Sequence, residues 1–424
     1  MICYYFPPLL DVGCKRSVAF SKYLKSHGWE PHVLSVRNPD KHYCILGTDR
    51  EPLGVPVTYI RSLFSLAWCL GKINGLINRV ISPFGGKLKR NYMYDLFCIP
   101  DLFIGWIPSA IIGGYQLIRK HNADFIYISC SPFSSAISGI ILKKITSKPL
   151  IIDFRDPLAV NIPDYCGVPN FRRKINLRIE RKIIEFADIF IVNTEEVRSG
   201  YIDAYPEIAD KTIAIHNGFD CEHTPADNLK KYNKFTVVYG GNMYFSANKS
   251  VSFFEAIASL KESKQIDKGS FQFLYFGQDN RSVCEIAEKY GITDLVLAES
   301  FISHAEMLKV LVRSHLQLLR IIKPMISTKL FEGIALNIPF LATIPQGEVA
   351  DIIAVYSPSS YVVHEDSPLA IGAAIVSAIA AHRQGLIENN LVSQFLERFS
   401  RENMTRELEK ALEKISSGGS RLST

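Results

Sequence analysis

The sequence lacks the short motifs that identify the commonest metal and cofactor sites. Its nine cysteines include no Cys-x-x-Cys pair, and the closest two are eleven positions apart, which argues against a zinc site and a disulfide framework. It has no GxGxxG, no P-loop, no HExxH and no Asp-x-Asp. The odd number and irregular spacing of the cysteines predict a reducing compartment. No charged leader precedes an apolar stretch at the start, so we expect no signal peptide. We therefore expect neither a metal nor a cofactor.

The composition is that of an ordinary globular chain. Hydrophobic residues make up 47% and charged residues 21% of the 424, which excludes a largely disordered, collagen-like or coiled-coil protein. The length predicts two to three domains. Thirteen basic and six acidic side chains fall within residues 1–100, so we expect the N-terminal half to face any anionic partner. No basic run with interleaved aromatics indicates nucleic acid.

Short apolar runs alternate with helical stretches along most of the chain. The runs 124–130 (DFIYISC) and 149–154 (PLIIDF) are typical of buried strands, whereas 135–145 and 172–186 have the patterning of helices. Strands that alternate with helices predict an α/β fold with parallel, doubly wound sheets.

One polar stretch interrupts this alternation and predicts the domain organisation. Residues 221–234 are charged and poor in apolar side chains, so we interpret them as a linker. They separate an N-terminal domain over 1–220 from a C-terminal domain over 235–389. A late helix is expected over 390–415 and a disordered tail over 416–424.

Polar residues that follow the predicted strands are the candidate ligand sites, because open parallel sheets bind ligands at the carboxyl ends of their strands. Residues 5–16 (YFPPLLDVGCKR) lead into a helix expected over 17–27, either as an anion-binding loop or as a plain connection. DFRDP at 153–157 closes an apolar strand with three charges. These charges indicate either a mutual salt bridge or a constellation that binds a sugar.

Two further stretches lie in the C-terminal domain. Gly240-Gly241-Asn242 follows a strand, where glycine lets a ligand approach the backbone or simply allows a tight turn. In STKLFEGIALNIP at 327–339, Lys329 and Glu332 share one face of a predicted helix. A helix N-terminus with a lysine suits a diphosphate, and the carboxylate suits ribose hydroxyls. The alternative is an ordinary Lys–Glu surface pair.

Two more segments have a pattern with a structural alternative. Residues 303–306 (SHAE) have the spacing of a capping box, and we interpret them as structural. Residues 61–90 combine apolar side chains at helical spacing with six interspersed or following basic residues. This pattern predicts an amphipathic helix on an anionic membrane surface, or a helix packed on the domain core.

Taken together, these residues resemble the family 4-like retaining glycosyltransferases of the GT-B fold. The resemblance covers about residues 2–370 in the family's order. In the N-terminal half it rests on YYFPP, HGWEPHVLSV, IPDLFIGWIP, DFRDP, ADIFIVNTEEV and HNGFD. In the C-terminal half it rests on YGGNMY and STKLFEGIALNIPFLA. It implies two Rossmann-like domains facing a cleft, with an acceptor on the N-terminal side, a nucleotide-sugar donor on the C-terminal side, and a last helix that returns to the first domain.

The resemblance also implies roles for individual residues. The donor would be bound by Lys329 at its diphosphate, by Glu332 at its ribose, and by other contacts from Gly240, Gly241, Asn242, Lys249 and Gly13. The catalytic residues would be Asp156, Arg155 and Lys329. The family's mechanism retains the anomeric configuration and needs no metal, and the nucleotide-sugar is a substrate.

The resemblance implies a biological setting as well as a reaction. It predicts a cytoplasmic or peripheral inner-membrane enzyme that moves a sugar to a lipid-linked or glycan acceptor in bacterial surface-polysaccharide biosynthesis. Two departures from the family's pattern keep alternatives open. Many relatives have two glutamates eight positions apart, and Pro324 occupies the place of the first. Leu10-Asp11 replaces the Gly-Gly pair that usually follows FPP. The alternatives are a nucleotide-sugar 2-epimerase of the same fold and a non-catalytic relative that binds nucleotide or glycan.

Overall fold

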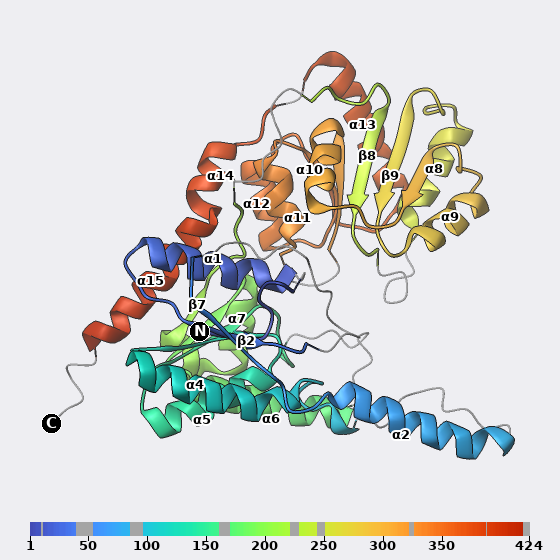
Figure 1. The fold of residues 1–424 in the computed structure, drawn as a ribbon. Coiled ribbons are helices and arrows are strands. Elements are labelled where there is room, and N and C mark those ends of the chain that lie inside the picture. The colour runs from blue at the N-terminus through green and yellow to red at the C-terminus, as the bar shows by residue number, and fades with distance from the viewer. Residues whose placement is uncertain are drawn as a thin grey trace. The chain divides into compact units, whose positions relative to one another are not determined.

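The computed structural model consists of two compact units, Met1–His216 together with Arg401–Thr424, and Asn217–Ser400 (Figure 1). Each unit has its own sheet and its own core. Of the sequence-predicted features, Lys249 and parts of the linker and tail lie outside the described residues. The structure describes residues 1–9, 12–39, 54–84, 96–160, 170–220, 229–243, 251–321, 326–386 and 388–418.

Unit 1 is built on a seven-stranded parallel sheet. The strand order is β3-β2-β1-β4-β5-β6-β7, so the order reverses between the neighbours β1 and β4. Every residue of β4 and β5 is buried, which explains why these strands are continuous apolar runs rather than alternating ones. The strands are β1 (Ile2–Cys3), β2 (Val33–Val36), β3 (Val57–Ile60), β4 (Ile126–Cys130), β5 (Leu150–Phe154), β6 (Ile189–Val192) and β7 (Thr212–Ala214).

The helices of unit 1 cover this sheet, and one of them differs from the sequence prediction. The helix expected over 17–27 begins earlier, at Val12. Cys14 lies in its first turn, and its side chain is buried in the core of unit 1. Gly13 therefore lies within a helix and not in a loop. The helices are α1 (Val12–Ser26), α2 (Leu66–Ile81), α4 (Ile107–His121), α5 (Ser134–Thr146), α6 (Asn170–Phe186), α7 (Glu195–Ala204) and α15 (Arg401–Gly418), with 3₁₀ turns at Ser82–Phe84, Ile104–Trp106 and Pro206–Lys211.

Unit 2 is built on a six-stranded parallel sheet of order β10-β9-β8-β11-β12-β13. Here the order reverses between β8 and β11, which are hydrogen-bonded neighbours. The strands are β8 (Phe235–Gly240), β9 (Phe271–Phe276), β10 (Val296–Glu299), β11 (Leu316–Arg320), β12 (Phe340–Thr343) and β13 (Tyr361–Val363). The helices are α8 (Ser252–Glu262), α9 (Asn280–Lys289), α10 (His304–Arg313), α11 (Thr328–Ala335), α12 (Glu348–Tyr356), α13 (Pro368–Gln384) and α14 (Val392–Phe399). The predicted fold class, two doubly wound parallel-sheet domains, is confirmed.

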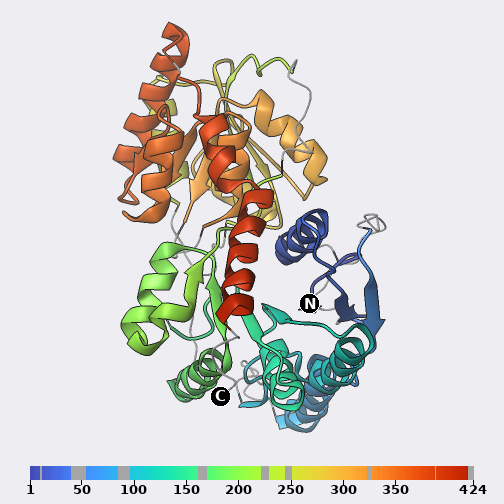
Figure 2. The same cartoon turned by 90° about the vertical axis from the view of Figure 1, so that its left-hand side faces the viewer.

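The late helix predicted over 390–415 is two helices, α14 and α15, as Figure 2 also shows. The chain is extended at Ser400, which separates them. Phe395 and Phe399 of α14 pack in the core of unit 2, whereas α15 packs against α1 in unit 1. A single straight helix is not formed because the two apolar faces belong to different cores.

Candidate functional site

The reversal of strand order in unit 2 brings the predicted donor residues together. Gly240 ends β8 and Arg320 ends the neighbouring β11, so the loops that follow both strands leave the sheet at the same edge. Crevices at such a reversal are where doubly wound sheets bind ligands. The helix α11 follows β11 and begins beside this edge, with Ser327 as its N-cap accepting a hydrogen bond from the Lys329 N–H.

Lys329 lies against the glycine loop. Its Nζ is 3.9 Å from the centroid of the Tyr239 ring. A β-carbon on Gly241 would lie 3.1 Å from the same Nζ, and Gly241 has a φ of +109°, which favours glycine. Within the described ranges, the ammonium makes no hydrogen bond and no ion pair. The structure therefore brings Lys329, Gly240 and Gly241 close together.

The electrostatics of this site favour an anion. Burial lowers the pKa of Lys329 to about 8, with Glu332 opposing the shift and Arg320 adding to it. Burial also lowers the pKa of Arg320. Two desolvated cations at the positive end of α11 form a site in which a bound diphosphate would offset the cost of burying charge. Arg320 was not among the residues predicted from the sequence, although a charge at the end of the apolar run LQLLR is a usable signal.

Glu332 lies one turn further along α11. Its side chain is 12% exposed, and its Oε1 is 2.9 Å from Nε2 of His304, the first residue of α10. The predicted capping box is confirmed: Ser303 and Glu306 exchange hydrogen bonds at the start of α10. From the sequence, His304 was expected only within this capping box, and its contact with Glu332 was not predicted.

The loop after β8 is fixed by its own hydrogen bonds. The Gly241 N–H donates to the Phe276 carbonyl at 2.7 Å, and the Tyr275 hydroxyl donates to the Gly241 carbonyl at 2.9 Å. The Tyr239 hydroxyl holds the Asn242 carbonyl at 2.8 Å. Among the described residues, the buried Asn242 Oδ1 has no hydrogen-bond donor.

In the DFRDP stretch of unit 1, Asp153 makes buried structural contacts, whereas Arg155 and Asp156 are the candidate site residues. Asp153 is fully buried and receives two hydrogen bonds from Arg16, at 2.7 and 3.1 Å, and one from the Tyr127 hydroxyl. Arg16 also donates to the Ile215 and His216 carbonyls, both at 2.8 Å. The mutual salt bridge considered for this stretch therefore forms between Asp153 and a distant arginine, not Arg155.

Arg155 lies at the reversal of strand order in unit 1. It donates to the carbonyls of Cys130 and Ser131, at 3.3 and 3.0 Å, just after β4. Its Nη1 would lie 1.6 Å from a β-carbon on Gly13, so the guanidinium rests directly on the first turn of α1. Asp156, the next residue, is exposed. Gly13, Arg155 and Asp156 thus lie in unit 1, and the other described site candidates in unit 2.

A buried glutamate that the sequence analysis missed holds the segment after DFRDP. Glu180 on α6 accepts hydrogen bonds from the backbone N–H groups of residues 158, 159 and 160, at 2.9, 2.8 and 3.0 Å. The Tyr201 hydroxyl is a fourth donor, at 2.8 Å. Burial raises the pKa of Glu180. The signal in the sequence was a carboxylate on the same helix face as the apolar Ile183 and Ile184.

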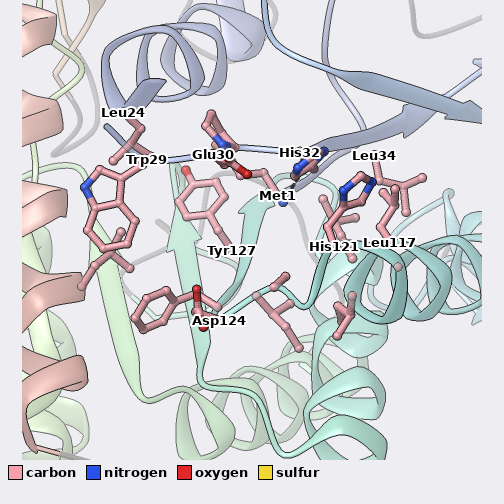
Figure 3. Close-up of a pocket in the computed structure, with 18 of the residues that line it drawn as sticks. Met1, Leu24, Trp29, Glu30, His32, Leu34, Leu117, His121, Asp124 and Tyr127 are labelled. Atoms are coloured by element: carbon pink, nitrogen blue, oxygen red, sulfur yellow. Dashed lines mark hydrogen bonds between the residues drawn. The ribbon is translucent and has the colours of Figure 1, made fainter. Parts of the chain in front are cut away.

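A separate cavity of about 200 Å³ lies at the opposite, amino-terminal edge of the unit 1 sheet (Figure 3). Trp29, Leu24 and Tyr127 contribute to its walls, and His32 stacks on His121 with ring centroids 3.7 Å apart. None of the predicted site residues lines it. In the part of the chain that the structure describes, no group of three or more His, Cys, Asp or Glu side chains is placed to hold a metal ion.

Comparison with known proteins defines the class of this fold. Residues 61–223 match the family model Glycosyltransferase Family 4. The chain resembles a crystal structure of Anabaena HepE in complex with UDP and glucose, with a TM-score of 0.63, 15% identity and coverage of 97% of this chain and 98% of that one. A search of curated protein sequences found no match.

Two further solved structures have the same architecture. The lipopolysaccharide outer core galactosyltransferase WaaB, in its apo form, aligns with a TM-score of 0.56 and 12% identity over 97% of this chain and 98% of that one. A putative UDP-N-acetylglucosamine 2-epimerase from Listeria monocytogenes aligns with a TM-score of 0.56 and 11% identity over 95% and 94%. At these identities the likeness establishes the fold, which is GT-B. With the family match, it confirms the predicted resemblance to family 4-like glycosyltransferases.

Proposed function

We propose that this protein is a glycosyltransferase that takes a sugar from a nucleoside-diphosphate donor held in unit 2. The observation that carries the proposal is the desolvated Lys329 ammonium at the N-terminus of α11, beside Arg320 and against the glycine loop. This arrangement suits a diphosphate, whose charge grows when the sugar leaves. Glu332 would accept hydrogen bonds from the ribose hydroxyls, and the Asn242 Oδ1 would be a further acceptor for the ligand. UDP is the first candidate, since structural relatives are described with UDP.

We propose a transfer with retention at the anomeric carbon. The bond between that carbon and the diphosphate oxygen breaks, and a bond to the acceptor hydroxyl oxygen forms on the same face of the sugar. The hydroxyl proton passes to the leaving phosphate, so no protein base or metal is required. Lys329 and the N–H groups of α11 stabilise the leaving diphosphate, and we assign Arg155 and Asp156 to the sugar and acceptor side.

A panel of nucleotides, four diphosphates and one monophosphate, tests the donor site. Thermal unfolding would be followed with UDP, GDP, ADP, CMP and dTDP, for wild type and for Lys329→Ala. A ligand at 100 times its Kd stabilises its domain by about 2.7 kcal/mol. This corresponds to a shift of roughly 5–11 °C for a domain of about 200 residues. A shift with one nucleotide that disappears in the variant supports the site, and no shift with any of them contradicts the proposal.

We further propose that the acceptor is a lipid-linked or glycan intermediate of bacterial surface-polysaccharide synthesis, reached at the cytoplasmic face of the plasma membrane. α2 supports this setting, since it projects from the rest of unit 1 (Figure 1). Trp68, Leu76 and Val80 on α2 are 55%, 65% and 64% exposed, and Leu70 is the buried residue of the helix. None of the helices in the described ranges is long and apolar enough to cross a membrane.

The charge around α2 matches an anionic lipid surface. Residues 54–94 contain no acidic side chain and six basic ones. Lys72 on α2 lies over the Trp68 ring at 4.0 Å, so a cation and an exposed aromatic side chain lie together. Exposed apolar side chains with interspersed cations are typical of helices that lie in the membrane interface.

Co-sedimentation with vesicles tests the membrane surface. The protein should bind phosphatidylcholine vesicles containing phosphatidylglycerol, and bind pure phosphatidylcholine weakly. The double variant Lys72→Glu/Arg79→Glu should lose this binding. The matched variant Lys268→Glu/Lys289→Glu, which removes the same charge from exposed positions in unit 2, should keep it. Equal binding to both vesicle types, or to neither, contradicts the electrostatic interaction.

A nucleotide-sugar 2-epimerase is the second candidate, favoured by the likeness of the fold to the Listeria protein. An epimerase acts on the nucleotide-sugar without an acceptor. Incubating the protein with UDP-N-acetylglucosamine alone, followed by chromatography of the products, separates the two activities. Formation of an epimer without acceptor would replace the transferase proposal. Nucleotide binding without turnover of any kind would indicate a non-catalytic relative.

A further inference from the structure

The first turn of α10 contacts the proposed donor site through two side chains. His304 and Met307 are three residues apart and therefore share one face of this helix. Met307 fills the space above Gly240, where a β-carbon would lie 2.9 Å from its Sδ and Cε. His304 contacts Glu332 on α11. One helical turn thus contacts both the loop after β8 and the carboxylate of α11.

We infer that His304 is a positioning residue that holds Glu332 in the orientation needed to bind the ribose hydroxyls of the donor. The inference deepens the proposed function and rests on it. A carboxylate can only accept hydrogen bonds, so the His304 Nε2 at 2.9 Å carries the hydrogen and donates it to Oε1.

The burial of the two partners fits this role. Glu332 is 12% exposed, so few solvent molecules fix its carboxylate, whereas His304 is 43% exposed and can be changed without opening a core. Ser303 and Glu306 form a capping box at the start of α10, where their hydrogen bonds involve each other and the backbone. His304 and Glu332 are 28 residues apart and lie on different helices, so this contact is a product of the tertiary fold.

Discrimination between ribose and 2′-deoxyribose measures this role directly. We would determine the Kd of the ribonucleoside diphosphate that the thermal panel selects, and of its 2′-deoxy counterpart, by isothermal titration calorimetry. A hydrogen bond to a charged group gives the wild type a preference for the ribonucleotide of roughly tenfold or more. His304→Ala should reduce this preference to about twofold, mainly by weakening the ribonucleotide. His304→Gln, which keeps a donor N–H near the position of Nε2, should restore most of it.

Two further variants separate positioning from structure. Glu306→Ala removes half of the capping box without touching Glu332; it should lower the melting temperature slightly and leave the ribose preference unchanged. Glu332→Gln should lose the preference, and adding His304→Ala to it should change nothing more, since both act on the same contact.

Each result of the titrations is decisive. An unchanged ribose preference in His304→Ala overturns the inference while leaving the donor site intact. An equal loss in Glu306→Ala shows that His304 serves only the helix start, and also overturns it. If no nucleoside diphosphate binds the wild type, the proposed function itself fails, and the inference falls with it.

Discussion

The protonation of Lys329 should control donor binding at mildly alkaline pH. Its pKa is lowered to about 8 by burial, so the amine is mostly charged at pH 7.5 and mostly neutral at pH 9. A diphosphate attracts the charged form, and binding above the pKa requires uptake of a proton. At pH 9 about a tenth of the amine is protonated, so the affinity should be roughly eight- to tenfold weaker than at pH 7.5, about 1.3 kcal/mol.

Arginine at the same position provides the control. An arginine stays charged well above pH 9, so Lys329→Arg should bind with nearly constant affinity across this range, even if its larger side chain weakens binding overall. The assay is isothermal titration with the selected nucleoside diphosphate at pH 7.5, 8.25 and 9. Repeating the titration at pH 9 in two buffers of different ionisation heat should show close to one proton taken up by wild type.

Two results would refute this reasoning. An affinity of the wild type that stays flat between pH 7.5 and 9 would mean that the amine is not the titrating partner of the diphosphate. An equal loss of affinity in Lys329→Arg would assign the pH dependence to another group. A bound anion raises the pKa of the amine in the complex, so the decline should begin near pH 8 and continue with a slope of at most one proton.

Three other perturbations follow from buried groups. Burial lowers the pKa of His315 from 6.5 to about 4, so unit 2 should lose up to about 3 kcal/mol of stability as the pH falls from 6.5 to 4, and His315→Gln should reduce this loss in urea unfolding. Arg16→Met leaves the buried Asp153 without its cation, and should cost unit 1 about 3–5 kcal/mol in chemical denaturation, more than Arg16→Met/Asp153→Leu. Glu180→Ala leaves three buried N–H groups without an acceptor. It should destabilise unit 1 by about 3 kcal/mol or more and increase proteolysis after Pro157. Glu180→Gln, which keeps an acceptor oxygen, should lower the stability of unit 1 less.

Local patterns predicted the fold class well. Continuous apolar runs between helical stretches require strands that are buried on both faces, and that condition implies parallel sheets covered by helices. The same reasoning placed candidate ligand residues after strand ends, and in the structure Gly240 ends β8, Gly241 follows it, and the start of α11 follows β11. The spacing of Lys329 and Glu332 placed both on one face of a helix, because helix geometry is local.

Local patterns could not predict which side chains meet. Arg16 lies 137 residues from Asp153, and His304 lies 28 residues from Glu332. No periodicity connects such pairs, since their contact depends on strand order and helix packing. The break at Ser400 has the same origin, because a continuous helical pattern does not reveal that its two halves are buried in different cores.

The sequence by itself therefore determined the two parallel-sheet domains and the chemical types of residue at their strand ends. Only the tertiary structure decided how those residues are buried and which side chains they contact. It buried the Lys329 ammonium against Tyr239, added Arg320 beside it, and placed the Arg155 guanidinium on Gly13. The physical reason is that backbone geometry follows from neighbouring residues, whereas desolvation and the pairing of charges depend on side chains that the fold brings in from distant parts of the chain.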